Sequence, residues 1–169
     1  MTPIHIIGQP GSGKTTLIVD IIKELSRQKI KVGSIKHSAH VHELDKPGKD
    51  SFRHRKAGAS PVTMVTREMA AIYLPGTEEI TPQALLEKYY SNIDIVLIEG
   101  WISGPYDKIE VWRKTVKKLP LFTGISHVKA FVSDDTLDPE TMRQANTKKI
   151  HCFKKNDILS LVESILKIT

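Results

Sequence analysis

The sequence predicts an α/β fold in which helices flank a mostly parallel β-sheet. Short apolar runs alternate along the chain with amphipathic segments, as strands and helices do in such folds. The run at residues 93–98 is almost continuously apolar, which is typical of a strand that is covered on both faces. A glycine-rich segment directly follows the first apolar run and supplies the turn from a strand into a helix.

The first third of the chain predicts two strands and two helices. Residues 4–7 are apolar and end in a glycine, which indicates a buried strand. From Lys14 onward, apolar side chains recur at spacings of one, three and four residues, so a helix is expected there. A second strand is predicted at residues 30–35, a polar loop with a Pro-Gly pair at 37–50, and a second helix at 51–59.

The middle of the chain predicts an inserted β-hairpin. Residues 62–66 and 69–74 are apolar runs joined by Arg67 and Glu68, so we expect them to pair as antiparallel strands. A helix is then predicted from Thr81, a good N-cap that precedes a proline, to the region of Tyr90.

The last third continues the alternation of strands and helices. Asp138 precedes a proline and is expected to cap a short helix that runs to Asn146. An amphipathic helix is expected at residues 157–168. The remaining strands are predicted at residues 109–112, 128–132 and 150–153.

The composition is that of one globular domain. The chain has 169 residues, of which 40% are apolar and 26% charged, so a single domain spanning 1–169 can bury its own core. The one cysteine, Cys152, excludes an internal disulfide and is expected to be buried as a small apolar side chain. No apolar run is long enough to cross a membrane, and the first residues lack the pattern of a secretory signal. We therefore expect a cytoplasmic protein with no membrane partner.

The net charge of +6 is concentrated in one segment. Residues 27–56 contain nine Lys or Arg and three Asp or Glu, which accounts for the whole excess. This local charge predicts an anionic ligand such as a phosphate group, or an acidic partner. Nucleic acid is not expected as a partner, because the chain has no helix-turn-helix or zinc-finger spacing and only 6% aromatic residues.

Residues 8–15, with the sequence GQPGSGKT, fit the phosphate-binding pattern GxxxxGK[ST] at every fixed position. Gly11 and Gly13 allow the backbone to wrap around a phosphate, and the N–H groups of the loop bind the phosphate oxygens. Lys14 supplies a cation for the β- and γ-phosphates, and the Thr15 hydroxyl is a Mg²⁺ ligand. Because the motif lies between a predicted strand and a predicted helix, the fold is expected to be of the P-loop NTPase type.

An acidic residue follows the apolar run at 93–98. Glu99 is the first residue that can emerge from the edge of the sheet, where it would hold a Mg²⁺-bound water or polarise the attacking water. Gly100 leaves room for a phosphate or metal to approach. Lys14 and Glu99 are therefore the expected catalytic residues; the alternative is that Glu99 only ends its strand at the surface.

The polar segment 36–51 begins where a predicted strand ends, so it is expected at the same sheet edge as the P-loop. Asp45 or Asp50 can join a Mg²⁺ shell, and Lys46 or Lys49 can bind phosphates. Two alternatives stay open: a solvated basic loop, and a transition-metal site. Zinc would need a closed tetrahedral set, and no cysteine lies near the candidate ligands His37, His40, His42 and Asp45.

Three segments together resemble one family, the molybdopterin-guanine dinucleotide biosynthesis protein B (MobB) family. They are the P-loop GQPGSGKTT, the segment IKHSAHVHELDKPGKDSFRHRKAGA and the strand end IVLIEGW. The second segment is the most specific, because many NTPases share the P-loop. The resemblance covers residues 3–113 and is only general beyond Arg113.

The resemblance implies a GTP-binding accessory protein of molybdenum cofactor biosynthesis that forms a homodimer and hydrolyses GTP weakly with Mg²⁺. Such a protein assists the guanylyltransferase MobA, which attaches GMP to molybdopterin, and molybdopterin itself is a further candidate ligand. The nucleotide-binding residues that the resemblance implies are Gly11, Ser12, Gly13, Lys14, Thr15, Thr16, Lys36, His37 and Lys49. The implied metal ligands are Thr15, Asp45 and Glu99.

The choice of guanine rests on the resemblance alone. General GTPases read guanine with [NT]-K-x-D, but here residues 146–149 read NTKK and are followed by Ile150 in place of an acidic residue. Asp134 or Asp135, after the strand predicted at 128–132, can replace the missing carboxylate.

Two other functions remain open at this point. A small-molecule kinase has the same P-loop but needs an arginine-bearing lid; Arg53 and Arg55 can belong to one, and no long Arg-rich segment follows. A nucleotide-binding adaptor without hydrolysis needs only the P-loop.

The predicted hairpin bears on the oligomeric state. Apolar side chains fall on both of its faces: Val62, Met64, Val65, Met69, Ala71, Ile72 and Leu74. A second copy of the hairpin can bury the extra face through a two-fold interface, and the alternative cover is a helix of the same chain. The resemblance, which implies a homodimer, favours the first of these.

Overall fold

The computed structural model describes residues 1–76 and 80–167. Strands and helices follow one another largely as the sequence predicts. The strands are β1 (Thr2–Ile7), β2 (Val32–Lys36), β3 (Val62–Val65), β4 (Ala70–Tyr73), β5 (Ile95–Glu99), β6 (Lys108–Val111), β7 (Val128–Val132) and β8 (His151–Phe153). The α-helices are α1 (Lys14–Arg27), α2 (Asp50–Lys56), α3 (Pro82–Tyr89), α4 (Pro139–Thr147) and α5 (Ile158–Leu166).

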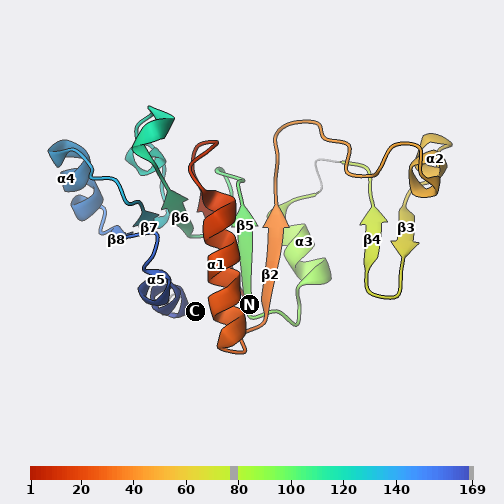
Figure 1. Ribbon diagram of the computed structural model, residues 1–169, viewed down its shortest axis with the longest axis horizontal. Coiled ribbons are helices and arrows are strands. Elements are labelled where there is room, and N and C mark those ends of the chain that lie inside the picture. Colours follow the sequence, from red (N-terminus) through yellow and green to blue (C-terminus); the bar gives the residue numbers. More distant parts are fainter. Residues whose placement is uncertain (77–79, 168–169) are drawn as a thin grey trace. The chain divides into compact units, whose positions relative to one another are not determined.

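The chain divides into two compact units. The first, called the sheet unit, comprises Met1–Ser38 and Leu86–Thr169; the second, called the hairpin unit, comprises Ala39–Leu85. The sheet unit holds a six-stranded sheet, and the hairpin unit holds α2, β3 and β4 (Figure 1). That the whole chain folds as the single domain 1–169 stays a prediction.

The sheet of the sheet unit has the strand order β2-β5-β1-β6-β7-β8, and every neighbouring pair is parallel. The predicted parallel α/β fold is therefore confirmed. Parallel strands end at the same edge, and in Figure 1 the arrowheads of β2, β5 and β6 point to the edge at which the loop into α1 lies. This carboxyl edge carries the candidate site.

Apolar side chains cover both faces of the sheet. Successive residues of a strand point to opposite faces, so Ile6 and Ile7 of β1 enter different clusters. Ile6 packs with the apolar stripes of α1 and α5, which contact each other. Ile7 packs with Phe122, Phe131 and Ala145 on the other side. Burial on both faces explains why β5 reads as a continuous apolar run.

The predicted helix starts are confirmed by their caps. The Asp138 carboxylate accepts hydrogen bonds from the backbone N–H groups of Glu140 and Thr141, at 3.1 and 3.0 Å. Thr81 Oγ1 accepts from the Ala84 backbone N–H at 3.1 Å. The last helix, α5, ends at Leu166; Ile168, to which it was expected to extend, lies outside the described residues.

The structure differs from the sequence-based expectations in three places. Two short 3₁₀ helices, Lys114–Val116 and Leu121–Thr123, were not predicted. The second begins where buried Glu110 accepts hydrogen bonds from the backbone N–H groups of Leu121 and Phe122, and burial raises the pKa of this carboxyl to about 7. Cys152 is exposed and not buried, because β8 is the last strand of the sheet and its side chains are only partly covered.

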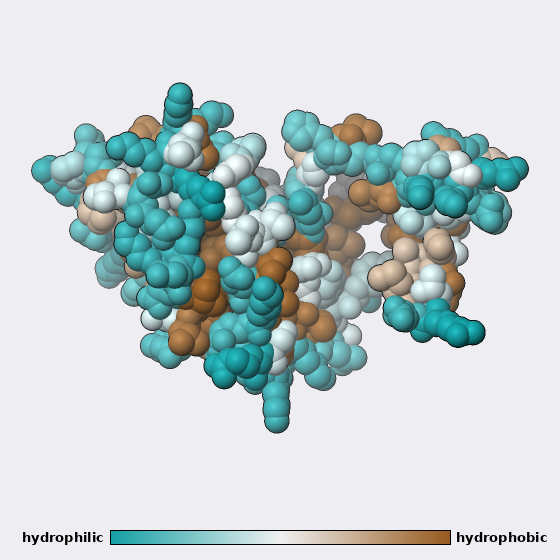
Figure 2. All heavy atoms as spheres, viewed as in Figure 1, coloured by the Kyte–Doolittle hydropathy of each residue, from teal (hydrophilic) through white to brown (hydrophobic). Residues whose placement is uncertain are grey.

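The predicted hairpin is confirmed within the hairpin unit. β3 and β4 pair antiparallel, from Val62 opposite Tyr73 to Val65 opposite Ala70. Val62 is buried and α2 packs against β3, so one face of the hairpin is covered by the chain itself. Figure 2 shows apolar residues over the strands of this hairpin and a hydrophilic tip.

Candidate nucleotide-binding site

The P-loop, residues 8–15, runs from the end of β1 to the first residue of α1. Gly13 precedes the helix with φ +98°, a left-handed conformation that only glycine adopts at little cost. The first backbone N–H groups of α1 have no acceptor within the helix, so they are free for an anion. Ser12 is fully buried, and its Oγ has no hydrogen-bond partner in the described part of the chain.

Lys14 lies folded back over this loop. Its Nζ donates to the carbonyl oxygens of Gly8 and Gln9, at 2.9 and 3.1 Å. Burial lowers the pKa of Lys14, while the nearby carboxylate of Glu99 opposes that shift. Carbonyl oxygens are weaker partners for an ammonium group than a phosphate is. The side chain is therefore available to an anion that enters the loop.

The predicted metal ligands Thr15 and Glu99 meet at the same edge. The Thr15 hydroxyl lies 3.2 Å from both carboxylate oxygens of Glu99, to which it donates. β5 pairs with β1 and β2 in a register that sets Glu99 opposite Ile6 and Lys36. The Lys36 ammonium lies 3.5 Å from Glu99 Oε1. A hydroxyl and a carboxylate at this spacing fit Mg²⁺, which binds one or two protein oxygens and completes its shell with phosphates and water.

His37 and Trp101 border the end of β5. Their rings stack with centroids 4.4 Å apart, and the His37 backbone N–H donates to the Glu99 carbonyl at 2.9 Å. Gly100 has φ +84°, and a Cβ there would lie 2.9 Å from the His37 carbonyl oxygen. A larger residue at position 100 would push apart the ends of β2 and β5 that carry Lys36 and Glu99.

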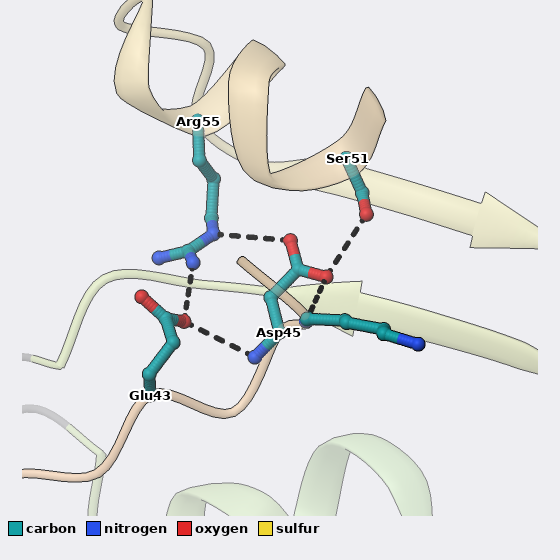
Figure 3. Close-up of polar contacts among 5 residues, drawn as sticks. Glu43, Asp45, Ser51 and Arg55 are labelled. Atoms are coloured by element: carbon teal, nitrogen blue, oxygen red, sulfur yellow. Dashed lines mark hydrogen bonds and ion pairs between the residues drawn. The ribbon is translucent and has the colours of Figure 1, made fainter. Parts of the chain in front are cut away.

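Asp45 and Lys49, the other predicted site residues, lie in the hairpin unit. Asp45 is buried at the centre of a local network (Figure 3). Its Oδ1 accepts from the Lys46 backbone N–H at 2.8 Å and from Ser51 Oγ at 3.0 Å, and its Oδ2 lies 3.7 Å from Arg55 Nε. Arg55 also binds the Glu43 carboxylate. These contacts tie the polar loop to α2, and a metal-binding role for Asp45 stays a prediction.

The transition-metal alternative finds no support. Within residues 1–76 and 80–167, no group of three or more His, Cys, Asp or Glu side chains is arranged to hold a metal ion. His37 stacks on Trp101, while His40 and His42 contact each other edge to face. Arg55, considered above as a lid residue of a kinase, is bound to Glu43 and Asp45.

The motif search missed one residue that the fold brings to the P-loop. Arg113 directly follows the predicted strand at 109–112, and a Cβ on Gly13 would lie 2.8 Å from its Nη2. Its place directly after a predicted strand could have indicated this, because side chains that follow parallel strands gather at the ligand-binding edge of the sheet.

The loops after β7 and β8 also meet at this edge. Asp134, which follows β7, accepts a hydrogen bond through Oδ1 from the Lys155 backbone N–H at 3.0 Å. Its Oδ2 lies 3.8 Å from Lys155 Nζ, and more than half of the side chain, 58%, is exposed. Asp135 is held differently, because its Oδ2 accepts from the Lys114 backbone N–H at 2.7 Å.

No helix among the described residues is both long and apolar enough to span a bilayer.

Comparison with known proteins gives a consistent result. The sequence profile of the family "Molybdopterin guanine dinucleotide synthesis protein B" (MobB) matches residues 4–134. A molybdopterin-guanine dinucleotide biosynthesis adapter protein from Haemophilus influenzae is 39% identical over 116 residues, which cover 68% of this chain and 65% of that protein. The adapter protein of Escherichia coli K12 is 36% identical over 132 residues, covering 76% and 75%.

A solved structure supports the fold. The crystal structure of a molybdopterin-guanine biosynthesis protein B has a TM-score of 0.74 and 24% identity, and the match covers 99% of each chain. The profile match spans more than half of the sequence, including the P-loop, the polar loop and the strand end at Glu99. This chain therefore belongs to the molybdopterin guanine dinucleotide synthesis protein B family.

Proposed function

We propose that this protein is a nucleotide-binding adapter of molybdopterin guanine dinucleotide biosynthesis, which binds GTP with Mg²⁺ and hydrolyses it slowly. The pathway follows from the family, and two curated relatives are named as adapters of it. The observation that carries nucleotide binding is the meeting of Lys14, Thr15 and Glu99 at one sheet edge.

The geometry gives each residue a role. The N–H groups at the start of α1 and the Lys14 ammonium bind the phosphates. Mg²⁺ supplies the charge that offsets the phosphate oxygens, and the Thr15 hydroxyl and the Glu99 carboxylate hold it or its water ligands. The Lys36 ammonium, 3.5 Å from Glu99 Oε1, pairs with that carboxylate and holds it close to the site.

Guanine is the proposed base, and Asp134 is the proposed residue that recognises it. Asp134 follows β7, which lies two strands from β1 on the side away from Glu99, so a nucleotide that spans the sheet edge has its base there. The Lys155 backbone N–H fixes one oxygen of the carboxylate, and the side chain stays largely exposed. A fixed, accessible carboxylate can accept both N1–H and N2–H of guanine.

Glu99→Gln should keep nucleotide binding and slow GTP hydrolysis by about 100-fold or more, because it preserves shape and removes the charge that holds the water-bearing metal. Binding is measured with a fluorescent GTP analogue, and hydrolysis by phosphate release with Mg²⁺ and with EDTA. Glu24→Gln, which makes the same change of charge on α1 beside Arg27, is the matched control.

An unchanged hydrolysis rate in Glu99→Gln would mean that Glu99 only ends its strand. Parallel measurements with ATP test the base, since faster turnover of ATP than of GTP contradicts the proposed choice of guanine.

We further propose a homodimer that forms through the hairpin. The face with Val62 and Tyr73 is covered by α2, whose Arg55 lies over the Tyr73 ring. The opposite face carries Val65 and Ile72, which are 73% and 51% exposed. An uncovered apolar face on a two-stranded sheet is an aggregation hazard unless another chain buries it, and a second copy does so through a two-fold axis.

The double variant Val65→Lys/Ile72→Lys should be a soluble monomer that still binds nucleotide, because two charges on the same face oppose its pairing with itself. Light scattering at micromolar concentration measures the mass of the variant and of the parent. Val19→Lys/Leu159→Lys, at exposed apolar positions of α1 and α5, should remain dimeric. A monomeric parent protein, or a variant as dimeric as the parent, contradicts this interface.

The proposed partner is the guanylyltransferase of the same pathway, with molybdopterin as a candidate ligand at the shared surface. GTP as ligand and the absence of a spanning helix among the described residues make the cytoplasm the proposed location.

A further inference from the structure

The guanidinium group of Arg113 lies directly against the P-loop. An ideal Cβ on Gly13 would lie 2.8 Å from Nη2 and 3.2 Å from Cζ of Arg113, so any side chain at position 13 would displace this guanidinium group. Gly13 is the N-cap of α1, where the backbone N–H groups open toward an anion.

Both chain neighbours of Arg113 are anchored to β7 or to the loop that follows it. The Trp112 backbone N–H donates to the Val132 carbonyl at 3.1 Å, and the Lys114 backbone N–H donates to Asp135 Oδ2 at 2.7 Å. The Trp112 indole N–H donates to the Lys118 carbonyl at 2.8 Å, which closes the loop that follows. The backbone of Arg113 is thus held in place before any ligand binds.

The charge of Arg113 has no close carboxylate partner among the described residues. Its Nε is buried without a hydrogen-bond partner, and in the described ranges no carboxylate lies within 4.0 Å of its guanidinium. Lys155, a second cation, is close enough that the charge of Arg113 helps burial to lower the pKa of Lys155. Asp134 and Asp135 act on Lys155 in the opposite direction. Neither lies within 4.0 Å of the Arg113 guanidinium, which stays charged and is therefore available to an anionic ligand.

The side of the P-loop on which Arg113 lies identifies that anion. β6 and β5 flank β1 on opposite sides, so Arg113 and the pair Thr15–Glu99 approach the loop from opposite sides. In the function proposed above, the metal and the γ-phosphate lie on the side of Thr15 and Glu99. The backbone of the loop itself cradles the α- and β-phosphates.

We propose that Arg113 binds the β-phosphate of the nucleotide from the β6 side of the P-loop. The contact exists in both the diphosphate and the triphosphate complex, so Arg113 is a binding residue and does not act on the transferred phosphate. This inference rests on the proposed nucleotide-binding function and adds the contact that retains the diphosphate.

The test compares GMP, GDP and GTP binding to the parent protein and to Arg113→Gln and Arg113→Lys. The glutamine variant should bind GDP and GTP about 10- to 100-fold more weakly, by the same factor, because both lose one charge-assisted hydrogen-bonding partner. GMP affinity should not change. Arg113→Lys, which keeps the charge but not the fork geometry, should recover part of the loss.

Steady-state hydrolysis adds a second readout. If Arg113 binds ground state and transition state equally, KM for GTP rises and kcat is unchanged. Arg143→Gln, an exposed arginine on α4, is the control and should match the parent in both measurements. Thermal melting identifies a variant that fails to fold. If Arg113→Gln does not fold, the comparison is made with Arg113→Lys.

Three results would overturn the inference. They are unchanged GDP affinity in both variants, equal loss of GMP affinity, and a fall in kcat without a rise in KM. Failure of the proposed function looks different, because then the parent protein binds no GDP or GTP, or Lys14→Ala binds them as the parent does.

Discussion

Lys14→Ala should abolish measurable nucleotide binding while leaving the protein folded. The ammonium is the strongest donor in the P-loop, and among the described residues its hydrogen bonds go to the carbonyl oxygens of Gly8 and Gln9. Losing a charged hydrogen-bond donor costs about 1.5–3 kcal/mol per contact, so two phosphate contacts correspond to a loss of affinity of roughly 100-fold or more. Titration with a fluorescent GTP analogue measures it.

Lys23→Ala is the matched control for this variant. Lys23 lies on the same helix and is 74% exposed, and its only described ion pair is a loose one with Asp20 at 3.9 Å. Its substitution should change neither affinity nor melting temperature.

Because the pKa of Lys14 is lowered by burial, the Lys14→Ala variant should also be at least as stable as the parent. Unchanged affinity in Lys14→Ala would contradict the P-loop as the nucleotide site.

The part of the site built from local sequence was predictable. A P-loop needs a strand, a glycine turn and a helix start within a few residues, and all three lie next to one another in the chain. Glu99 was predictable for the same reason, since an apolar run that ends in an acidic residue marks a buried strand end. The structure brings Glu99 to Thr15 across 84 positions because β5 pairs with β1.

The other part of the site depends on strand order, which local patterns do not determine. Arg113 lies against Gly13 only because β6 is the second neighbour of β1, and the predicted strand at 109–112 fits several positions in a sheet equally well. For Asp45 the metal-binding role stays a prediction. Its acidic, polar surroundings suggest a ligand, but the structure buries it with Arg55 and Ser51. Position near basic residues cannot separate a local ion pair from a metal ligand.

The proposed choice of Asp134 over Asp135 likewise rests on partners that lie far away in sequence. Asp135 Oδ2 accepts from the Lys114 backbone N–H at 2.7 Å, so this carboxylate ties the loop after β6 to the loop after β7. Asp134 bridges to the loop after β8 and keeps 58% of its side chain exposed. This greater exposure is why we propose Asp134, of the two carboxylates, as the contact to the base.

Asp134→Asn should therefore exchange guanine for xanthine. The carboxylate accepts from N1–H and N2–H of guanine, whereas an amide presents a donor that opposes N2–H and suits the oxygen that xanthine carries at that carbon. The amide oxygen can still accept from N1–H, but N2–H loses its acceptor and faces a donor, which costs about 1–3 kcal/mol, so GTP affinity should fall by about 10- to 100-fold, and xanthosine triphosphate should become the tighter ligand. Competition of each nucleotide against a fluorescent analogue measures both changes.

Asp135→Asn is the matched control, one residue away and with the same change of charge. It should keep the preference for guanine and lose stability instead, because the amide is a weaker acceptor for the Lys114 backbone N–H than the carboxylate is. A switch to xanthine in Asp135→Asn would indicate that Asp135, and not Asp134, recognises the base. If neither variant switches while Lys14→Ala still loses all binding, the phosphates are bound as proposed and the base is recognised outside the loop after β7.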